Sequence, residues 1–236
     1  MDCSISFEKV GCKTPSIANK INCLCVLGVL NNKQGIAIKQ EMLEWLSQQF
    51  NVVVCLQDTP GDMFEFPAIK TATELSIRYN KNVLYIHSKG AGNKIPGNFK
   101  TAMMAPGIKY PQSATPEDCQ RIVRLMWKKE FTYPRLNNYL DVLNTSVPTV
   151  VCPFTGPERI TWQNGWLMNP TAASILSKSL HLSSDRYYYE QVFMHLSDIV
   201  VKGMILNDFS LTEQHHKRLW DAIWSYYDEA EIRKMV

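Results

Sequence analysis

Residues 82–92 of the chain read Asn-Val-Leu-Tyr-Ile-His-Ser-Lys-Gly-Ala-Gly. An apolar run over 83–86 is followed at once by a histidine, a hydroxyl, a cation and glycines. This pattern predicts a buried strand whose carboxyl end opens into a polar loop. Ligands of open α/β sheets bind just beyond the carboxyl ends of strands, and a lysine among glycine-freed backbone amides suits an anion such as phosphate. We therefore expect His87 and Lys89 to lie at an anion site.

Two more strands and two helices precede this stretch. Residues 21–30 and 52–56 are nearly continuous apolar runs, which predict buried strands. Residues 35–50 and 67–79 carry apolar side chains at helical spacing and predict the connecting helices. Because strand–helix–strand crossovers are right-handed and join parallel strands, the loops at 31–35, 57–62 and 87–92 should open on the same edge of the sheet.

The rest of the chain predicts further elements around one core. We expect helices over about 116–130 and 134–143, strands over 149–154 and 164–168, and helices that begin near 170 and 183. We expect an irregular or edge segment over 1–20, a mobile loop over 91–114 and a C-terminal helix over 212–236. A chain of 236 residues with 45% hydrophobic content can build one sizeable core. The predicted fold is a single α/β domain, residues 1–236, with a mostly parallel central sheet flanked by helices.

Composition narrows the function classes. The net charge of +3 fits a small anionic ligand, and without a basic stripe interleaved with aromatic residues we expect no nucleic-acid partner. Four of the seven cysteines, Cys23, Cys25, Cys55 and Cys152, lie in apolar runs, where thiols behave as small hydrophobes. With no signal-peptide pattern and no apolar stretch of membrane-spanning length, we expect a cytoplasmic protein without a transmembrane segment. The oligomeric state is not predicted.

Several other polar residues have both a functional and a structural interpretation. Asp58 and Asp62 could bind Mg²⁺ or Mn²⁺, but aspartates in a Pro-Gly turn are ordinary turn residues, and we favour the turn. Residues 163–166, Gln-Asn-Gly-Trp, suit sugar hydroxyls and sugar faces, or form a loop with a core tryptophan. Asp185 and Glu190 stand at a predicted helix start, where a carboxylate serves as a general base or compensates the helix dipole.

Three blocks of the sequence carry a family resemblance. The first block is Glu65-Phe66-Pro67-Ala68-Ile69-Lys70, followed after a helix by Val83-Leu84-Tyr85-Ile86-His87-Ser88-Lys89-Gly90. The second block is Trp127-Lys128-Lys129-Glu130-Phe131. The third block is Trp162-Gln163-Asn164-Gly165-Trp166-Leu167-Met168, and Arg186 and Glu190 follow it. Together, over about residues 21–196, they resemble bacterial and viral glycosyltransferase-like proteins that build capsular or surface glycans on a nucleotide-sugar-binding fold of the GT-A, Rossmann-like type. The first block is the most specific: it is similar to the family's "Glu-aromatic-Pro" helix start and its "Leu-Tyr-apolar-His-Thr-Lys-Gly" strand end.

The resemblance implies a hexosyl- or deoxyhexosyltransferase that moves a sugar from a nucleoside diphosphate sugar, with a UDP-sugar favoured, to a hydroxyl of a growing glycan. It implies four groups of site residues: Leu30, Asn31, Asp58, Glu65 and Lys70 at the nucleoside; His87, Ser88 and Lys89 at the diphosphate; Gln163, Asn164 and Trp166 at the sugar or acceptor; and Glu190 or Asp185 as the catalytic base.

The chain departs from the family at the metal motif. Many enzymes of this fold carry Asp-x-Asp after the third strand to hold manganese, whereas residues 87–89 here are His-Ser-Lys. A cation in that place can replace the charge of Mn²⁺ or Mg²⁺, so the resemblance does not imply a metal requirement. Two other functions stay open: a non-catalytic nucleotide-sugar or glycan-binding module on the same fold, and a nucleotidyltransferase, which needs clustered carboxylates.

Overall fold

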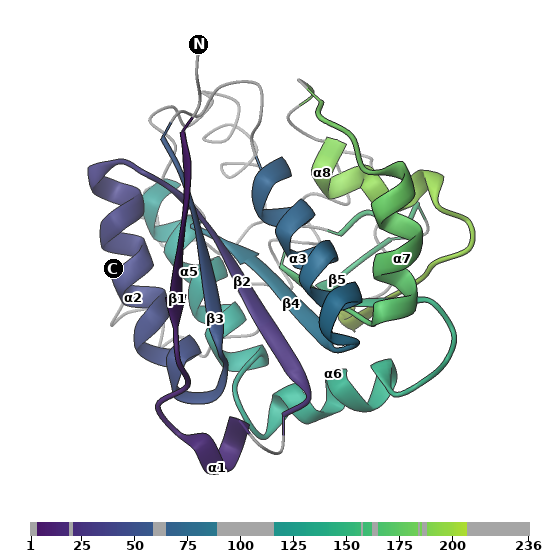
Figure 1. Ribbon diagram of the computed structural model, residues 1–236, viewed down its shortest axis with the longest axis horizontal. Coiled ribbons are helices and arrows are strands. Elements are labelled where there is room, and N and C mark those ends of the chain that lie inside the picture. Colours follow the sequence, from purple (N-terminus) through teal and green to yellow (C-terminus); the bar gives the residue numbers. More distant parts are fainter. Residues whose placement is uncertain are drawn as a thin grey trace, which may run out of the picture.

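The computed structural model describes residues 4–18, 21–58, 65–88, 116–156, 158–161, 165–183, 185 and 188–206 (Figure 1). These residues form a seven-stranded sheet with helices on both faces, which confirms the α/β class. The segments predicted as a mobile loop, 91–114, and as a C-terminal helix, 212–236, fall outside the described residues.

The sheet has the strand order β1-β3-β2-β4-β6-β5-β7. Its strands are β1 (Ile5–Val10), β2 (Cys23–Leu30), β3 (Val52–Gln57), β4 (Asn82–His87), β5 (Thr149–Phe154), β6 (Trp166–Met168) and β7 (Val200–Leu206). The segment predicted as irregular or edge structure thus contributes the edge strand β1.

The prediction of a mostly parallel sheet is wrong, because the sheet is mixed. Strand β2 pairs in parallel with β3 and β4, and β5 pairs in parallel with β7. Strand β1 runs antiparallel to β3, and β6 runs antiparallel to both β4 and β5. Residues 155–165 alone join β5 to β6, fewer than the dozen or so that a parallel crossover needs, so the chain returns antiparallel.

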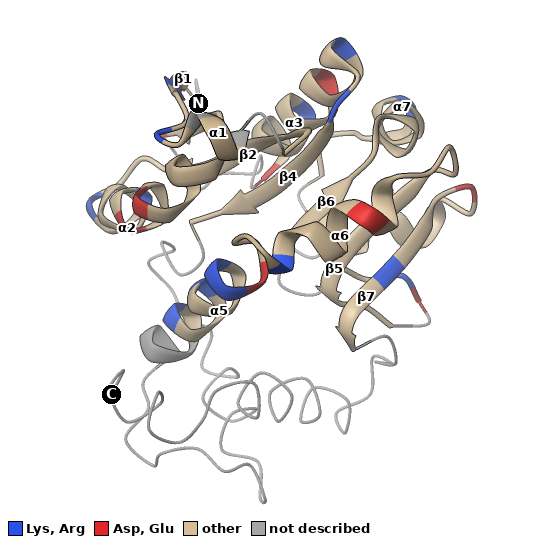
Figure 2. Ribbon diagram, turned by 90° about the horizontal axis from the view of Figure 1, so that it is seen from below, with Lys and Arg blue, Asp and Glu red and all other residues tan. Residues whose placement is uncertain are grey.

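Helices cover both faces of the sheet. They are α1 (Pro15–Ala18), α2 (Lys33–Gln49), α3 (Phe66–Tyr79), α5 (Pro116–Glu130), α6 (Arg135–Leu143), α7 (Pro170–Ser179), α8 (Tyr188–Gln191) and the 3₁₀ helix η2 (Val192–His195). Helices α2, α5 and α6 pack on one face, and α3 and α7 on the other (Figure 2). Tyr189 of α8 belongs to the same core cluster as α3 and α7. Alternate residues of β2 serve the two cores: Leu27 packs with Met42 of α2, and Val26 with Ile69 of α3.

The strand cysteines are core residues, as predicted. Cys23, Cys25, Cys55 and Cys152 are all buried. Burial raises the pKa of Cys23 and of Cys55 to about 12, and it raises the pKa of Cys25 and Cys152 as well. These thiols therefore stay protonated near neutral pH and are not nucleophiles.

None of the helices in the described ranges has the length and apolar character needed to cross a membrane. This is the one aspect of the predicted localisation on which the structure bears.

Candidate functional site

The loops that follow β2 and β3 are joined by hydrogen bonds. The side-chain Nδ2 of Asn31 donates to Oδ1 of Asp58. The backbone N–H of Asn31 donates to the carbonyl of Gln57 at 2.7 Å. The first residues beyond two neighbouring strands therefore hold each other in place.

Ser88 connects β4 to the same place. Its backbone N–H donates to the carbonyl of Gly28 at 2.8 Å. Its hydroxyl oxygen accepts a hydrogen bond from the backbone N–H of Leu30 at 3.2 Å, and the residue is buried. The predicted convergence of the three strand-end loops on one edge of the sheet is confirmed for these residues; we call it the carboxyl edge.

His87 lies at the carboxyl edge between a carboxylate and two aromatic rings. Its Nδ1 is 3.6 Å from Oε1 of Glu65, the residue before α3. Its ring lies nearly parallel to that of Tyr85, with centroids 6.3 Å apart, and 5.6 Å from the ring of Trp127 on α5. The imidazole is thus approached from both faces of the sheet, by α3 on one side and by α5 on the other.

Tyr85 fixes the carboxylate. Its hydroxyl donates to Oε2 of Glu65 at 2.7 Å. Burial, and then the charge of Glu65, raises the pKa of Tyr85 well above its ordinary value, so the hydroxyl keeps its proton and remains a donor. Glu65 therefore bridges Tyr85 and His87. A carboxylate beside one ring nitrogen orients an imidazole and favours its charged form.

The side chains of His87 and Glu65 remain accessible to a ligand. They keep 15% and 24% of their surface exposed. Glu65, predicted to contact a nucleoside, is engaged with Tyr85 and His87, so its position indicates that it orients His87.

Trp127 brings an unpaired donor to this cluster. Its ring is fully buried, and a Cβ atom on Gly165 would lie 2.3 Å from its Nε1, so only glycine allows the chain to pass. Within the described part of the chain Nε1 has no hydrogen-bond partner. A buried donor without a partner is one that a ligand or a water molecule can satisfy.

The loop after β5 holds two more buried polar atoms without a hydrogen-bond partner in the described part of the chain. Oγ1 of Thr155 and Oε2 of Glu158 are buried and have no partner among the residues that the structure describes. Because β6 is antiparallel to both β4 and β5, the latter two strands point the same way, and this loop leaves the sheet at the carboxyl edge. Sequence reasoning missed Trp127, Thr155 and Glu158, since nothing local to them signals an unpaired polar atom.

Helix α8 carries the candidate base Glu190. Burial raises the pKa of the residue before it, Tyr189. The next residue, Glu190, is half-buried, and its carbonyl accepts from the backbone N–H of Thr161 at 2.9 Å. Asp185, in the segment before α8, is exposed.

Two predicted site residues, Lys70 and Trp166, make other contacts. Lys70 is exposed on α3 and pairs with Glu74 at 3.9 Å. Trp166 is fully buried, with its ring 4.9 Å from that of Tyr85 and 5.6 Å from that of Phe193. The buried ring of Trp166 supports Tyr85 from inside the core, and its predicted contact with a sugar stays a prediction.

The remaining predicted residues, Asp62, Lys89, Gln163, Asn164 and Arg186, lie outside the described residues. Within the described ranges, no three His, Cys, Asp or Glu residues gather as metal ligands, and Oδ1 of Asp58 already accepts from Asn31.

Comparisons of the chain with protein-family models, with curated proteins and with solved structures find no match. Any function must therefore be argued from the groups at the carboxyl edge. These are the linked pair Asn31 and Asp58, the Ser88 hydroxyl and an imidazole held by Glu65.

Proposed function

We propose that this protein is a glycosyltransferase that moves a sugar from a nucleoside diphosphate sugar to a hydroxyl of a glycan. The observation that carries this proposal is the linkage of three strand-end loops through Asn31, Asp58 and Ser88, beside the carboxylate-bound His87. Open α/β sheets bind ligands at this edge. The resemblance of residues 65–70 and 83–90 to glycosyltransferase motifs supports the same chemistry.

The nucleoside has suitable partners in the first two loops. Leu30 ends β2 and Asn31 follows it, and the amide of Asn31 with the carboxylate of Asp58 offers a donor and acceptors side by side. Such groups match the edge of a base and the hydroxyls of a ribose. Lys70 is not part of this proposal, because it faces solvent with Glu74.

The diphosphate would be held by His87, Ser88 and Lys89. In the reaction the bond from the anomeric carbon to the diphosphate oxygen breaks, and the electron pair leaves with the nucleoside diphosphate. An imidazolium oriented by Glu65 can stabilise the negative charge that develops there. The assignment of Lys89 rests on the sequence, since the residue lies outside the described part.

The acceptor hydroxyl attacks the anomeric carbon and gives its proton to a base. Glu190 and Asp185 are the candidates from the sequence, and Glu158 joins them because its Oε2 is buried without a partner in the described residues. Gln163 and Asn164 are the candidates from the sequence for the sugar hydroxyls.

A thermal-shift series with UDP, other nucleoside diphosphates and the matching nucleosides tests donor binding, each with and without Mn²⁺. A ligand at 100 times its Kd stabilises the native state by about 2.7 kcal/mol, which for a chain of this size raises Tm by roughly 5–10 °C. We expect this rise with at least one diphosphate and a much smaller one with its nucleoside.

Release of free sugar from the donor separates an enzyme from a binding module. Glycosyltransferases commonly leak some donor to water, so slow hydrolysis of a bound UDP-sugar is expected. Binding without turnover would favour the non-catalytic module. If no nucleoside diphosphate raised Tm, the proposal would fail.

A further inference from the structure

A polar pocket lies at the opposite edge of the sheet. Its volume is about 560 Å³. Asn22 precedes β2, Asn82 opens β4 and Asn169 follows the antiparallel β6, so the pocket sits at the amino ends of the parallel strands. A strand of six residues spans about 20 Å, so the pocket is distinct from the carboxyl edge.

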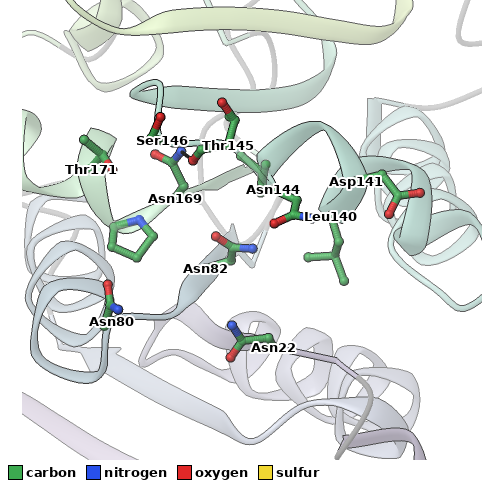
Figure 3. Close-up of a pocket in the computed structure, with 12 residues that line it drawn as sticks. Asn22, Asn80, Asn82, Leu140, Asp141, Asn144, Thr145, Ser146, Asn169 and Thr171 are labelled. Atoms are coloured by element: carbon green, nitrogen blue, oxygen red, sulfur yellow. Dashed lines mark hydrogen bonds between the residues drawn. The ribbon is translucent and has the colours of Figure 1, made fainter.

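Four asparagine side chains around this pocket are unengaged. Asn80 and Asn82 lie in one turn, and Asn22 and Asn144 come from two other segments. Asn22, Asn80 and Asn144 are exposed and Asn82 is half-buried, and within the described residues the four amide groups make no hydrogen bond. Figure 3 shows them around one space. Each primary amide offers two N–H donors and a carbonyl acceptor. The pocket therefore presents donors and acceptors from several directions at once.

The frame of the pocket is fixed by a fifth asparagine, Asn169. Its Oδ1 accepts from the backbone N–H groups of Thr149 at 3.1 Å and Ala172 at 2.9 Å, and its Nδ2 donates to the carbonyl of Val147 at 2.7 Å. This buried amide ties the start of β5 to the start of α7. Asn169 thus fixes the part of the pocket wall that lies between β5 and α7.

The lining selects among ligand classes. It contains no lysine, arginine or histidine, and its one charged residue is Asp141, so a phosphate or another anion has no cation to bind. Leu140, Leu143 and Pro170 supply an apolar part of the wall. Amides for hydroxyl groups beside apolar surface for C–H faces match a sugar ring, and a pocket of this volume has the size of a small-molecule site.

We propose that this pocket binds a neutral saccharide. The proposal does not depend on the glycosyltransferase function, because it rests on the free amides and on a lining without cations. If both proposals hold, a saccharide bound about a strand length from the diphosphate belongs to the acceptor glycan rather than to the donor.

Side-chain amide signals in ¹H–¹⁵N NMR spectra test this directly. The probes are the methyl glycosides of glucose, galactose, mannose and N-acetylglucosamine, titrated singly. At least one is expected to shift the side-chain signals of Asn82 and Asn144 to saturation. Asn82→Ala/Asn144→Ala should weaken that binding about tenfold, since two hydrogen bonds are lost. Asn138→Ala, on the exposed face of α6 and outside the lining, should bind like the parent chain.

Three results would overturn the saccharide proposal. No saturable shift with any of the four glycosides, or equal binding by the double variant, would overturn the proposal. A stronger response to triglycine than to every glycoside would assign the pocket to peptides and overturn it too. UDP should leave these signals unchanged. Saccharide binding here in a chain that binds no nucleoside diphosphate would retain this inference and remove the proposed donor site.

Discussion

His87→Ala is expected to slow donor turnover roughly 100- to 1,000-fold, which is the usual cost of removing one preorganised donor from a site of developing negative charge. The effect should fall on kcat, because the charge on the diphosphate grows in the transition state. The side chain is mostly buried against Tyr85 and Trp127, so a loss of stability of about 1 kcal/mol is expected as well. UDP release measured well below Tm separates the two effects.

His195→Ala is the matched control. His195 is exposed on η2, and the structure gives it no role at the carboxyl edge. Its replacement should change the rate less than twofold, by our rough expectation for a surface site. A His87→Ala variant that folds and turns over the donor at the parent rate would remove His87 from the mechanism.

Gly35→Ala is expected to destabilise the fold by about 2 kcal/mol net. A Cβ atom at this position would lie 1.9 Å from the carbonyl oxygen of Leu30 and 2.9 Å from its carbon. Both are backbone atoms, so the clash is relieved only by moving the first turn of α2 away from β2, at about 3 kcal/mol. The better helix propensity of alanine offsets about 1 kcal/mol of this.

Thermal unfolding measures this change, and Tm should fall by roughly 4–8 °C. UDP binding should weaken at the same time. Asn31 lies in the chain between Leu30 and residue 35, so it moves when these two residues are pushed apart. Gly11→Ala is the control, since a Cβ atom there meets nothing within 4 Å. An unchanged Tm in Gly35→Ala would show that α2 is not held as closely to β2 as described.

The three parallel strands β2, β3 and β4 were predictable because each has a clear signal in its own sequence. Continuous apolar runs at 21–30, 52–56 and 83–86 are typical of strands buried on both faces, and the crossover rule placed their ends together. The hydrogen bonds of Asn31 and Ser88 follow from that placement.

The antiparallel strands and β7 were harder to predict. Strand β6 has three residues, and its direction depends on a partner outside its own sequence. Strand β7 carries Lys202 and Gly203 in mid-strand and is partly exposed, so its sequence lacks the signal of a buried strand. Its pairing with β5 supplies the stability that its local sequence does not.

The roles of side chains at the site depended on tertiary structure even more. Glu65 precedes Tyr85 by 20 residues, and it meets the tyrosine only because α3 folds back over β4. Trp127 reaches His87 from the other face of the sheet. No periodicity in the sequence indicates contacts of this kind. The position of His87 at the end of a strand could therefore be predicted, but the residues that surround it could not.

The proposed function requires that a nucleoside diphosphate binds at the carboxyl edge. A UDP titration followed by ¹H–¹⁵N NMR tests this binding most directly. The backbone N–H signals of Leu30, Asn31, Asp58 and Ser88 are expected to shift together and saturate with a single Kd, while the side-chain signals of Asn82 and Asn144 stay in place. Unchanged backbone signals at these four residues in excess UDP, or shifts confined to the opposite edge of the sheet, would contradict the account.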